Sequence, residues 1–236
     1  MKPVILIPTY NESIAIVELL NKLSTLHNLR DFDVVVLDDN SPDKTADIAK
    51  SLNLSGFSIL HRKVKSGLGP AYLAGFKHGL TGSYQYFVEM DADLSHQPEQ
   101  LVDLLDAAAQ DTLVIGTRWI PGGSVVNWPK RRQYLSRAGT AYAKLALRIP
   151  LNDLTGGFRV YSVELLKSLK LEDMQSTGYC YQIEMALAAH LAGAKEIEVP
   201  ITFVERINGV SKMSQAIVVE ALVQTTRWGL SRTFRP

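Results

Sequence analysis

Cysteine is almost absent from the chain: one thiol, that of Cys180, occurs in 236 residues. A single thiol cannot form an internal disulfide, so the fold needs no oxidising compartment. We therefore predict a cytoplasmic protein in which Cys180 is a small buried residue.

Long apolar runs are absent as well. No stretch of the sequence approaches the roughly eighteen consecutive apolar residues of a membrane span. The first twelve residues, MKPVILIPTYNE, lead directly into a predicted strand and lack the layout of a signal peptide. We expect a chain that does not cross a membrane.

The chain has no excess of charge of either sign. Its 25 basic and 24 acidic residues leave a net charge of +1, and 46% of its residues are apolar, as in an ordinary globular protein. One segment differs, because residues 117–148 contain no acid and seven bases: Arg118, Lys130, Arg131, Arg132, Arg137, Lys144 and Arg148. This stretch is either a solvated face or an anion-binding surface, and the lack of acids favours the second. Without interleaved stacking aromatics it does not indicate nucleic-acid binding.

Short β-branched runs alternate with helix-period segments in the first half of the chain. Strands are predicted at 4–8, 33–37, 57–60, 86–90 and 113–116. Helices are predicted around 16–23 and 101–108 and from Ser41-Pro42-Asp43, which combines a cap, a first-turn proline and an early carboxylate. This order predicts an α/β fold with a mostly parallel sheet flanked by helices.

Polar side chains collect where the predicted strands end: Pro8, Tyr10, Glu12, Asp38, Asp39, Asp91 and Asp93. Open α/β sheets bind ligands at this edge. The carboxylates of Asp91 and Asp93 offer hard oxygen ligands for Mg²⁺ or Mn²⁺, and such a cation suits a diphosphate. A solvated acidic turn or a helix cap is the alternative, because so short a motif often matches by chance.

Several longer strings follow in order over nearly the whole chain: IPTYNE, LDDNSPDKTADIA, KSGLGPAYLAGF, MDADLSHQPE, GTRW, DLTGGFRVY, YQIE and VPITFVERINGVSKMS. Together they resemble the dolichol-phosphate and polyprenyl-phosphate mannose synthases of the family 2 glycosyltransferases, and most of all the bacterial enzymes without a membrane anchor. The resemblance implies a GT-A, Rossmann-like fold. It also implies transfer of mannose from GDP-mannose to a polyprenyl monophosphate.

The resemblance also implies roles for single residues. The positions that hold the guanosine correspond to Pro8, Tyr10, Glu12, Leu37 and Asp39, of which Asp39 is the expected base contact. The metal and diphosphate site corresponds to Asp91, Ala92 and Asp93. The acceptor phosphate is expected on Arg118 and Arg132, and a loop that closes over the donor on Arg206 and Lys212. In one departure, Ser95 stands where some relatives carry a glutamine at the metal site, which leaves the choice of metal open.

The implied chemistry needs no general base. A phosphate monoester has a second pKa near ~6 and is already nucleophilic at neutral pH. The site must instead hold two anions together, and arginine forks and a metal ion do that. One displacement inverts the anomeric centre, so a β-linked product is predicted.

The rival functions are transfer from UDP-glucose or UDP-N-acetylglucosamine to the same lipid, and a non-catalytic regulatory subunit. A nucleotidyltransferase would need a glycine- and lysine-rich phosphate loop that the N-terminus lacks.

The tail carries apolar residues at helical spacing and only positive charges after Glu220. We predict a catalytic domain over residues 1–213 and an amphipathic helix or tail over 214–236. That helix either packs on the protein's own core or helps to bring the protein to the cytoplasmic face of a membrane or to a membrane-anchoring subunit.

Three further sets of residues carry open alternatives. Asp153 and Arg159 either have a structural role, in which they pair with each other or cap a turn, or take part in catalysis. Gln182 and Glu184 are either site contacts or an exposed helix face. His96 either begins a helix or supports the metal carboxylates.

Overall fold

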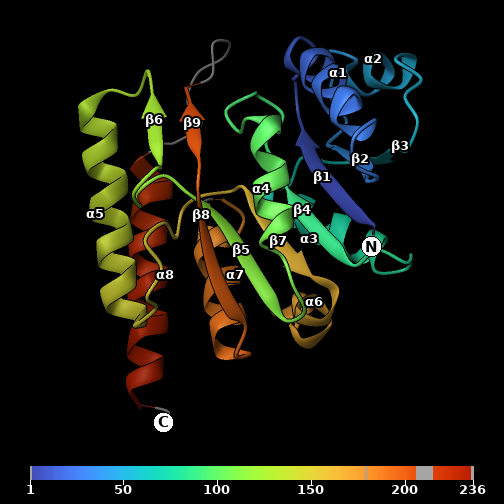
Figure 1. The fold of residues 1–236 in the computed structure, drawn as a ribbon. Helices are drawn as coiled ribbons and strands as arrows, with labels where there is room; N and C mark the ends of the chain where they lie inside the picture. The colour runs from blue at the N-terminus through green and yellow to red at the C-terminus, as the bar shows by residue number, and fades with distance from the viewer. Residues whose placement is uncertain (1, 179, 206–214, 235–236) are drawn as a thin grey trace.

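The computed structural model describes residues 2–178, 180–205 and 215–234. Its centre is a seven-stranded sheet with the order β3-β2-β1-β4-β7-β5-β8 (Figure 1). The strands are β1 (Pro3–Thr9), β2 (Asp33–Asp38), β3 (Phe57–His61), β4 (Tyr86–Glu89), β5 (Thr112–Thr117), β7 (Arg159–Ser162) and β8 (Lys195–Pro200). Only β7 runs antiparallel to its neighbours among these described strands. The predicted mostly parallel sheet and its five predicted strands are confirmed.

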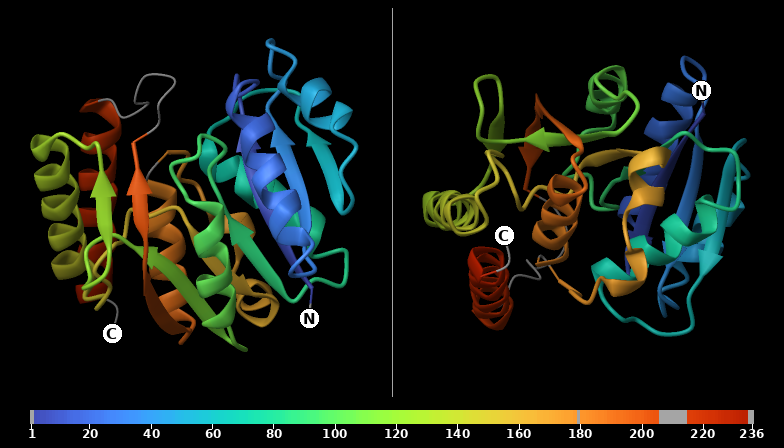
Figure 2. Two further views of the ribbon diagram at one scale, coloured as in Figure 1. Left: turned by 45° about the horizontal axis from the view of Figure 1, so that its top comes forward. Right: turned by 90° about the horizontal axis from the view of Figure 1, so that it is seen from below.

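Alternate residues of the central strands divide the core into two layers, one on each face of the sheet (Figure 2). Ile5 and Ile7 of β1 pack with α1 (Ala15–His27) and α4 (Leu101–Asp106). Val4 and Leu6 of the same strand pack with α3 (Leu68–Gly79) and α7 (Cys180–Leu191). The remaining short helices are α2 (Thr45–Ser51), α6 (Val163–Ser168), η1 (Pro98–Gln100) and η2 (Leu171–Asp173). Both layers hold the carboxyl edge of the sheet in place.

The predicted start of the second helix at Ser41 is wrong, because α2 begins at Thr45. The Asp38 carboxylate accepts hydrogen bonds from the Ser41 backbone N–H at 3.0 Å and from its hydroxyl at 2.6 Å. These bonds hold Ser41 in the turn after β2, and Lys44 then takes a left-handed conformation immediately before the helix. Ser41 therefore shapes the turn, and Asp43 accepts the backbone N–H of Thr45, the first residue of the helix, at 3.1 Å.

Two long helices pack beside the sheet on the far side from β3 (Figure 1). They are α5 (Lys130–Leu147) and α8 (Gln215–Phe234), and the small parallel pair β6 (Ser124–Val126) and β9 (Thr202–Val204) lies next to them. The predicted C-terminal helix is therefore present, and it packs on α5 and α7. Within the described chain no helix has the length and apolar character to cross a membrane. Cys180 is buried as predicted, and burial raises the pKa of its thiol to about 11.

Candidate active site

A cavity of about 390 Å³, with several carboxylates in its lining, lies at the carboxyl ends of β1, β2 and β4. Its lining includes seven of the predicted donor-binding residues: Pro8, Tyr10, Glu12, Asp39, Asp91, Ala92 and Asp93. Leu37 differs, because its side chain lies fully buried in the core against α3 and does not line the cavity. The structure thus brings the predicted donor residues together, with only the backbone of Leu37 left for the role proposed for that position.

His96 holds the turn that carries the Asp91 carboxylate. The Asp91 backbone N–H donates to Nδ1 of His96 at 3.1 Å, and the imidazole stacks on Phe158 with ring centroids 5.0 Å apart. Burial lowers the pKa of His96, which favours the neutral ring whose Nδ1 accepts this bond. His96 therefore supports Asp91, which is one of the two roles that the sequence suggested for it.

Ser95 orients the carboxylate of Asp93. Its hydroxyl donates to Oδ1 of Asp93 at 2.5 Å and its backbone N–H donates to the same oxygen at 3.1 Å. Ser95, which stands where some relatives carry a glutamine, is thus a hydrogen-bond donor to one of the two predicted metal-binding carboxylates. Such outer partners fix the direction in which a carboxylate points.

The acidic residues of the cavity can hold a divalent cation only together with further oxygen ligands from a bound molecule. Among the residues that the structure describes, no group of three or more His, Cys, Asp or Glu side chains is arranged for a metal ion. Asp91 and Asp93 therefore supply two carboxylates, and phosphate oxygens of a ligand would complete the shell. Mg²⁺ is commonly held in this way, by one or two carboxylates plus substrate phosphates. The donor set fits a cation that binds together with a diphosphate.

The rim of this cavity is formed by a segment to which no role was assigned from the sequence. Arg62 pairs with Asp39 at 2.5 Å; burial raises the pKa of Asp39 and the guanidinium opposes that rise. The Nζ atom of Lys65 lies 3.9 Å from the centre of the Tyr10 ring. Gly67 has a φ of 103°, and a Cβ there would lie 2.7 Å from the Thr177 carbonyl oxygen. Only glycine fits at this approach, and that glycine stands in the KSGLGP string.

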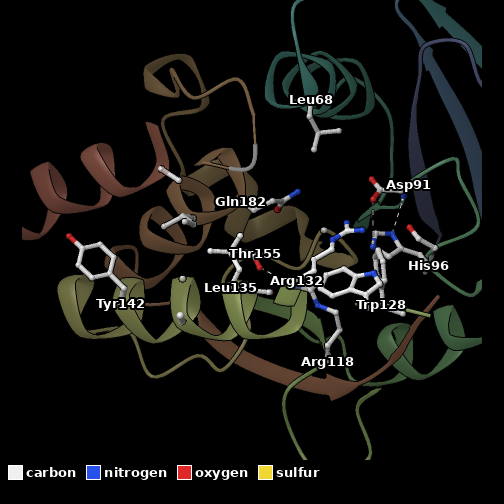
Figure 3. Close-up of a pocket in the computed structure, with 18 of the residues that line it drawn as sticks. Leu68, Asp91, His96, Arg118, Trp128, Arg132, Leu135, Tyr142, Thr155 and Gln182 are labelled. Carbon is white, nitrogen blue, oxygen red and sulfur yellow. Dashed lines mark hydrogen bonds and ion pairs between the residues drawn. The ribbon is translucent and has the colours of Figure 1, made fainter. Parts of the chain in front are cut away.

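A second cavity, of about 410 Å³, opens from the first and extends between α5 and α8 (Figure 3). The two cavities share Leu68, Asp91 and Asp93. Away from this junction the lining is largely apolar and aromatic, with Trp128, Leu135, Tyr142, Ile183, Phe203, Ala221 and Leu222. Arg118 and Arg132 line the same cavity. The first cavity is rich in carboxylates, the second is mostly apolar with two arginines, and the two cavities meet at Asp91 and Asp93.

Arg118 is held by a buried carboxylate. Its Nε donates to Oδ2 of Asp153 at 2.6 Å and its Nη2 to Oδ1 at 2.7 Å, while Thr155 accepts from Nη2 at 2.9 Å. Arg118 is 6% exposed and Asp153 is fully buried. Although burial opposes ionisation, the guanidinium holds the pKa of Asp153 below its usual range. The paired fork leaves Arg118 fixed in one orientation at the cavity wall.

The possible pairing of Asp153 with Arg159 is wrong, whereas the support of a turn is confirmed. Arg159 is fully buried and donates to the carbonyl oxygens of Leu154 at 2.9 Å, Gly156 at 2.8 Å and Gln182 at 2.6 Å. Its guanidinium thus ties the DLTGG loop to the start of α7. A charge takes this place because only a long side chain with several donors can satisfy three buried carbonyls at once.

Arg132 is positioned by an acid and an aromatic ring. Its Nη1 lies 2.5 Å from the Glu205 carboxylate, and its Cζ lies 4.1 Å from the centre of the Trp128 ring. The Cζ of Arg118 lies 5.2 Å from the same ring. Trp128 therefore packs against both guanidinium groups and sets them at the same cavity. The predicted loop residues Arg206 and Lys212 lie outside the described residues.

Gln182 and Glu184, the two polar residues of the YQIE string, have different surroundings. Glu184 accepts backbone N–H groups of Gln175 and Ser176 at 3.3 and 3.0 Å, so its carboxylate supports a loop. Gln182 is 1% exposed and lines the second cavity. Below them, at the end of β4, Glu89 is fully buried and accepts the Tyr181 hydroxyl at 2.9 Å. Burial raises the pKa of Glu89 to about 7 against the opposing effect of Arg159.

The sheet order and the joined cavities define a GT-A fold, the α/β architecture of nucleotide-sugar transferases. Among solved structures, glucosyl-3-phosphoglycerate synthase from Mycobacterium tuberculosis in complex with Mn²⁺, UDP-glucose and phosphoglyceric acid matches with a TM-score of 0.66 and 21% identity, over 100% of this chain and 80% of that one.

Residues 4–170 match the model of glycosyl transferase family 2, and the chain belongs to that family. An undecaprenyl-phosphate mannosyltransferase from Micrococcus luteus is 47% identical, over 98% of this chain and 95% of its own length. A polyprenol monophosphomannose synthase from Mycolicibacterium smegmatis is 42% identical, over 97% of this chain and 87% of its own length. The predicted family and GT-A fold are confirmed.

Proposed function

We propose that this chain transfers mannose from GDP-mannose to the phosphate of a polyprenyl monophosphate and forms a β-linked product. The observation that carries the proposal is the junction of the two cavities at Asp91 and Asp93. A cavity rich in carboxylates can hold a cation and so suits a sugar nucleotide, and an apolar cavity with two arginines suits a lipid phosphate. The names of the two relatives, a mannosyltransferase and a monophosphomannose synthase, support the sugar and the lipid class.

On the donor side, Pro8, Tyr10 and Glu12 would contact the nucleoside, and Asp39 would accept hydrogen bonds from the base. Asp91 and Asp93, with Ala92 between them, would hold Mg²⁺ or Mn²⁺ on the diphosphate. When bound, that cation supplies charge neutralisation to the departing nucleoside diphosphate. The Mn²⁺ in the solved complex of glucosyl-3-phosphoglycerate synthase is consistent with this cofactor class. Arg206 and Lys212 are proposed to close over the donor.

On the acceptor side, Arg118 and Arg132 would steady the lipid phosphate. Both groups already have an acidic partner, Asp153 and Glu205 respectively. Asp153 is fully buried and bound through two oxygens, so Arg118 keeps its partner and presents a fixed guanidinium edge. Glu205 is partly exposed, with 22% of its side chain accessible, so a phosphate can compete with it for Arg132. We therefore assign Arg118 to alignment and Arg132 to capture of the acceptor.

The protein would meet its lipid substrate at the cytoplasmic face of a membrane, either directly or on a membrane-anchoring subunit. Apolar side chains of α5 and α8 are exposed: Tyr134, Leu135, Leu145, Val219, Leu222, Val223 and Leu230. Of these, Leu135 and Leu222 line the second cavity. Exposed bases Lys130, Arg131 and Arg137 lie on the same α5 helix. Apolar and basic groups side by side are the features of an interfacial helix. Failure of the purified chain to float with anionic liposomes that contain polyprenyl phosphate would count against direct docking.

The proposal is tested by incubating the protein with radiolabelled GDP-mannose, Mg²⁺ or Mn²⁺ and a polyprenyl phosphate, followed by solvent extraction. We expect label in the organic phase, and we expect GDP to compete better than UDP. Arg132→Ala should abolish this label, whereas Lys77→Ala, which removes an exposed base on α3 outside both cavities, is the control and should retain it. Label transferred only from UDP-glucose or UDP-N-acetylglucosamine would replace the donor assignment. No transfer from any donor, with nucleotide binding intact, would indicate a regulatory subunit.

A further inference from the structure

Gln182 is a buried amide without a hydrogen-bond partner. It is 1% exposed, and neither Oε1 nor Nε2 of its side chain has a partner among the described residues. The amide lies beside the Glu89 carboxyl and lowers the pKa of that group, but the contact does not reach hydrogen-bond geometry. Buried polar groups are nearly always paired, and an unpaired one costs stability. An orphaned amide at the wall of a cavity therefore indicates a ligand that satisfies it.

The place of this amide is close to the junction of the two cavities. A Cβ atom built on Gly157 would lie 3.5 Å from Nε2 of Gln182, 3.5 Å from Cε1 of His96 and 4.0 Å from Oδ2 of Asp91. All four residues line the second cavity, and Asp91 also lines the first (Figure 3). The missing side chain of Gly157 thus leaves a space between the amide and a carboxylate of the donor site. This space lies next to Asp91, one of the residues that the two cavities share.

The chemistry of the amide selects among the parts of the two substrates. An amide offers two donors and one acceptor oxygen, and a hydroxyl group both donates and accepts. A phosphate dianion only accepts, so it would satisfy Nε2 and repel Oε1. With both atoms unpaired, the complementary ligand is a pair of hydroxyls. The hexose is the hydroxyl-bearing group that the reaction places at the junction.

We propose that Gln182 is a sugar-binding residue whose amide hydrogen bonds to hydroxyl groups of the transferred hexose, in a space that Gly157 keeps open. This inference rests on the proposed transferase function. It adds a specificity contact on α7 to the donor residues of the strand ends. The hexose would lie between Asp91, which belongs to the diphosphate site, and the Gln182 amide, which does not contact the nucleotide.

The test compares the affinity of sugar nucleotide and free nucleotide, by calorimetry with Mn²⁺, for three variants. Gln182→Met keeps the shape and removes the amide, Gly157→Ala fills the open space, and Gln110→Met removes an exposed amide as the control. We expect both site variants to bind GDP as the wild type does and to bind GDP-mannose about tenfold or more weakly. The control should change neither affinity. Alanine at Gly157 meets only ordinary van der Waals contacts, so that variant should fold normally.

Thermal melting separates a binding role from a structural one. Because the amide is unpaired in the free protein, Gln182→Met should leave the melting temperature unchanged or raise it. A lower melting temperature together with unchanged GDP-mannose affinity would overturn the inference. So would an unchanged GDP-mannose affinity with a raised KM for the polyprenyl phosphate, since the amide would then serve the acceptor.

Failure of the proposed function has a different signature. If the wild type binds a UDP-sugar and not GDP-mannose, the donor assignment fails, and the same comparison of UDP-sugar with UDP still tests Gln182. If the wild type binds no sugar nucleotide more tightly than the free nucleotide, the inference is overturned as well.

Discussion

Removing one partner of the Arg118–Asp153 pair should destabilise the fold strongly. Arg118 is 6% exposed and Asp153 is fully buried, and two short hydrogen bonds join them. Loss of one partner of such a pair leaves an uncompensated buried charge and costs about 3–5 kcal/mol. Asp153→Asn should therefore lower the free energy of unfolding by this amount. Arg118→Met should lower the free energy of unfolding by an amount near the lower end of this range, because Arg159 also lies near Asp153 and partly compensates its charge.

The double variant Arg118→Met/Asp153→Asn separates the pair energy from the separate contributions. It leaves no unpaired charge, so it should cost no more than either single change, which corresponds to a coupling energy of roughly 3 kcal/mol between the sites. Urea denaturation followed by circular dichroism gives the free energy of unfolding of the wild type, the two single variants and the double variant. Additive effects of the two single changes would refute the argument that the pair acts as one buried unit.

Activity of the same double variant tests the role of Arg118 in the cavity. If Arg118 were only structural, a folded double variant would transfer mannose at the wild-type rate. We predict that the double variant folds, binds GDP with Mn²⁺ and transfers less than a hundredth of the wild-type label, because removing one charged transition-state contact costs about 3 kcal/mol, roughly a hundredfold in rate. Wild-type rates of transfer in this variant would remove Arg118 from the acceptor site.

Three further predictions follow from the same geometry. Asp93→Asn should weaken metal-dependent GDP binding at least tenfold, as chelation of the metal with EDTA should in the wild type. If titration calorimetry with Mn²⁺ gave the variant the GDP affinity of the wild type, the Asp93 carboxylate would not be a ligand. Arg132→Lys keeps the charge but loses the fork, so the KM for polyprenyl phosphate should rise severalfold while the KM for GDP-mannose stays unchanged; a change confined to the donor KM would contradict the assignment. Glu89 has its pKa raised to about 7 in the folded protein, so the stabilising effect of its protonated form is present at low pH and is lost as the pH rises through 7. The free energy of unfolding of Glu89→Gln should therefore rise relative to that of the wild type by roughly 2 kcal/mol between pH 5 and pH 8. If the two proteins lost or gained stability in parallel over this pH range, the prediction would be wrong.

The sheet could be read from the sequence where burial and propensity agree. The runs of β1, β2 and β5 are mostly buried and rich in valine, isoleucine and leucine, so periodicity locates them within a residue or two. β7 and β8 were not predicted, for two different reasons. β7 begins with the buried Arg159, and β8 alternates charged and apolar residues as KEIEVP at the edge of the sheet. A buried arginine breaks the apolar pattern on which strand prediction depends.

The candidate site could be predicted where its residues follow strand ends. Asp39, Asp91 and Asp93 were found in this way, because topology alone brings the ends of parallel strands together. The partners of the arginines could not be found, since Asp153 and Glu205 lie 35 and 73 residues away from Arg118 and Arg132 in the chain. No local pattern predicts such contacts. The orphaned amide of Gln182 is likewise visible only when its neighbours are placed.

The anomeric configuration of the product tests the central claim most directly. If donor and acceptor phosphate meet across the junction at Asp91 and Asp93, the phosphate attacks the sugar carbon once, from the side opposite the departing GDP. NMR of the extracted lipid product made from α-linked GDP-mannose should then show β-mannosyl phosphate. An α-linked product would contradict a single displacement at this junction and the arrangement of the two cavities on which it depends.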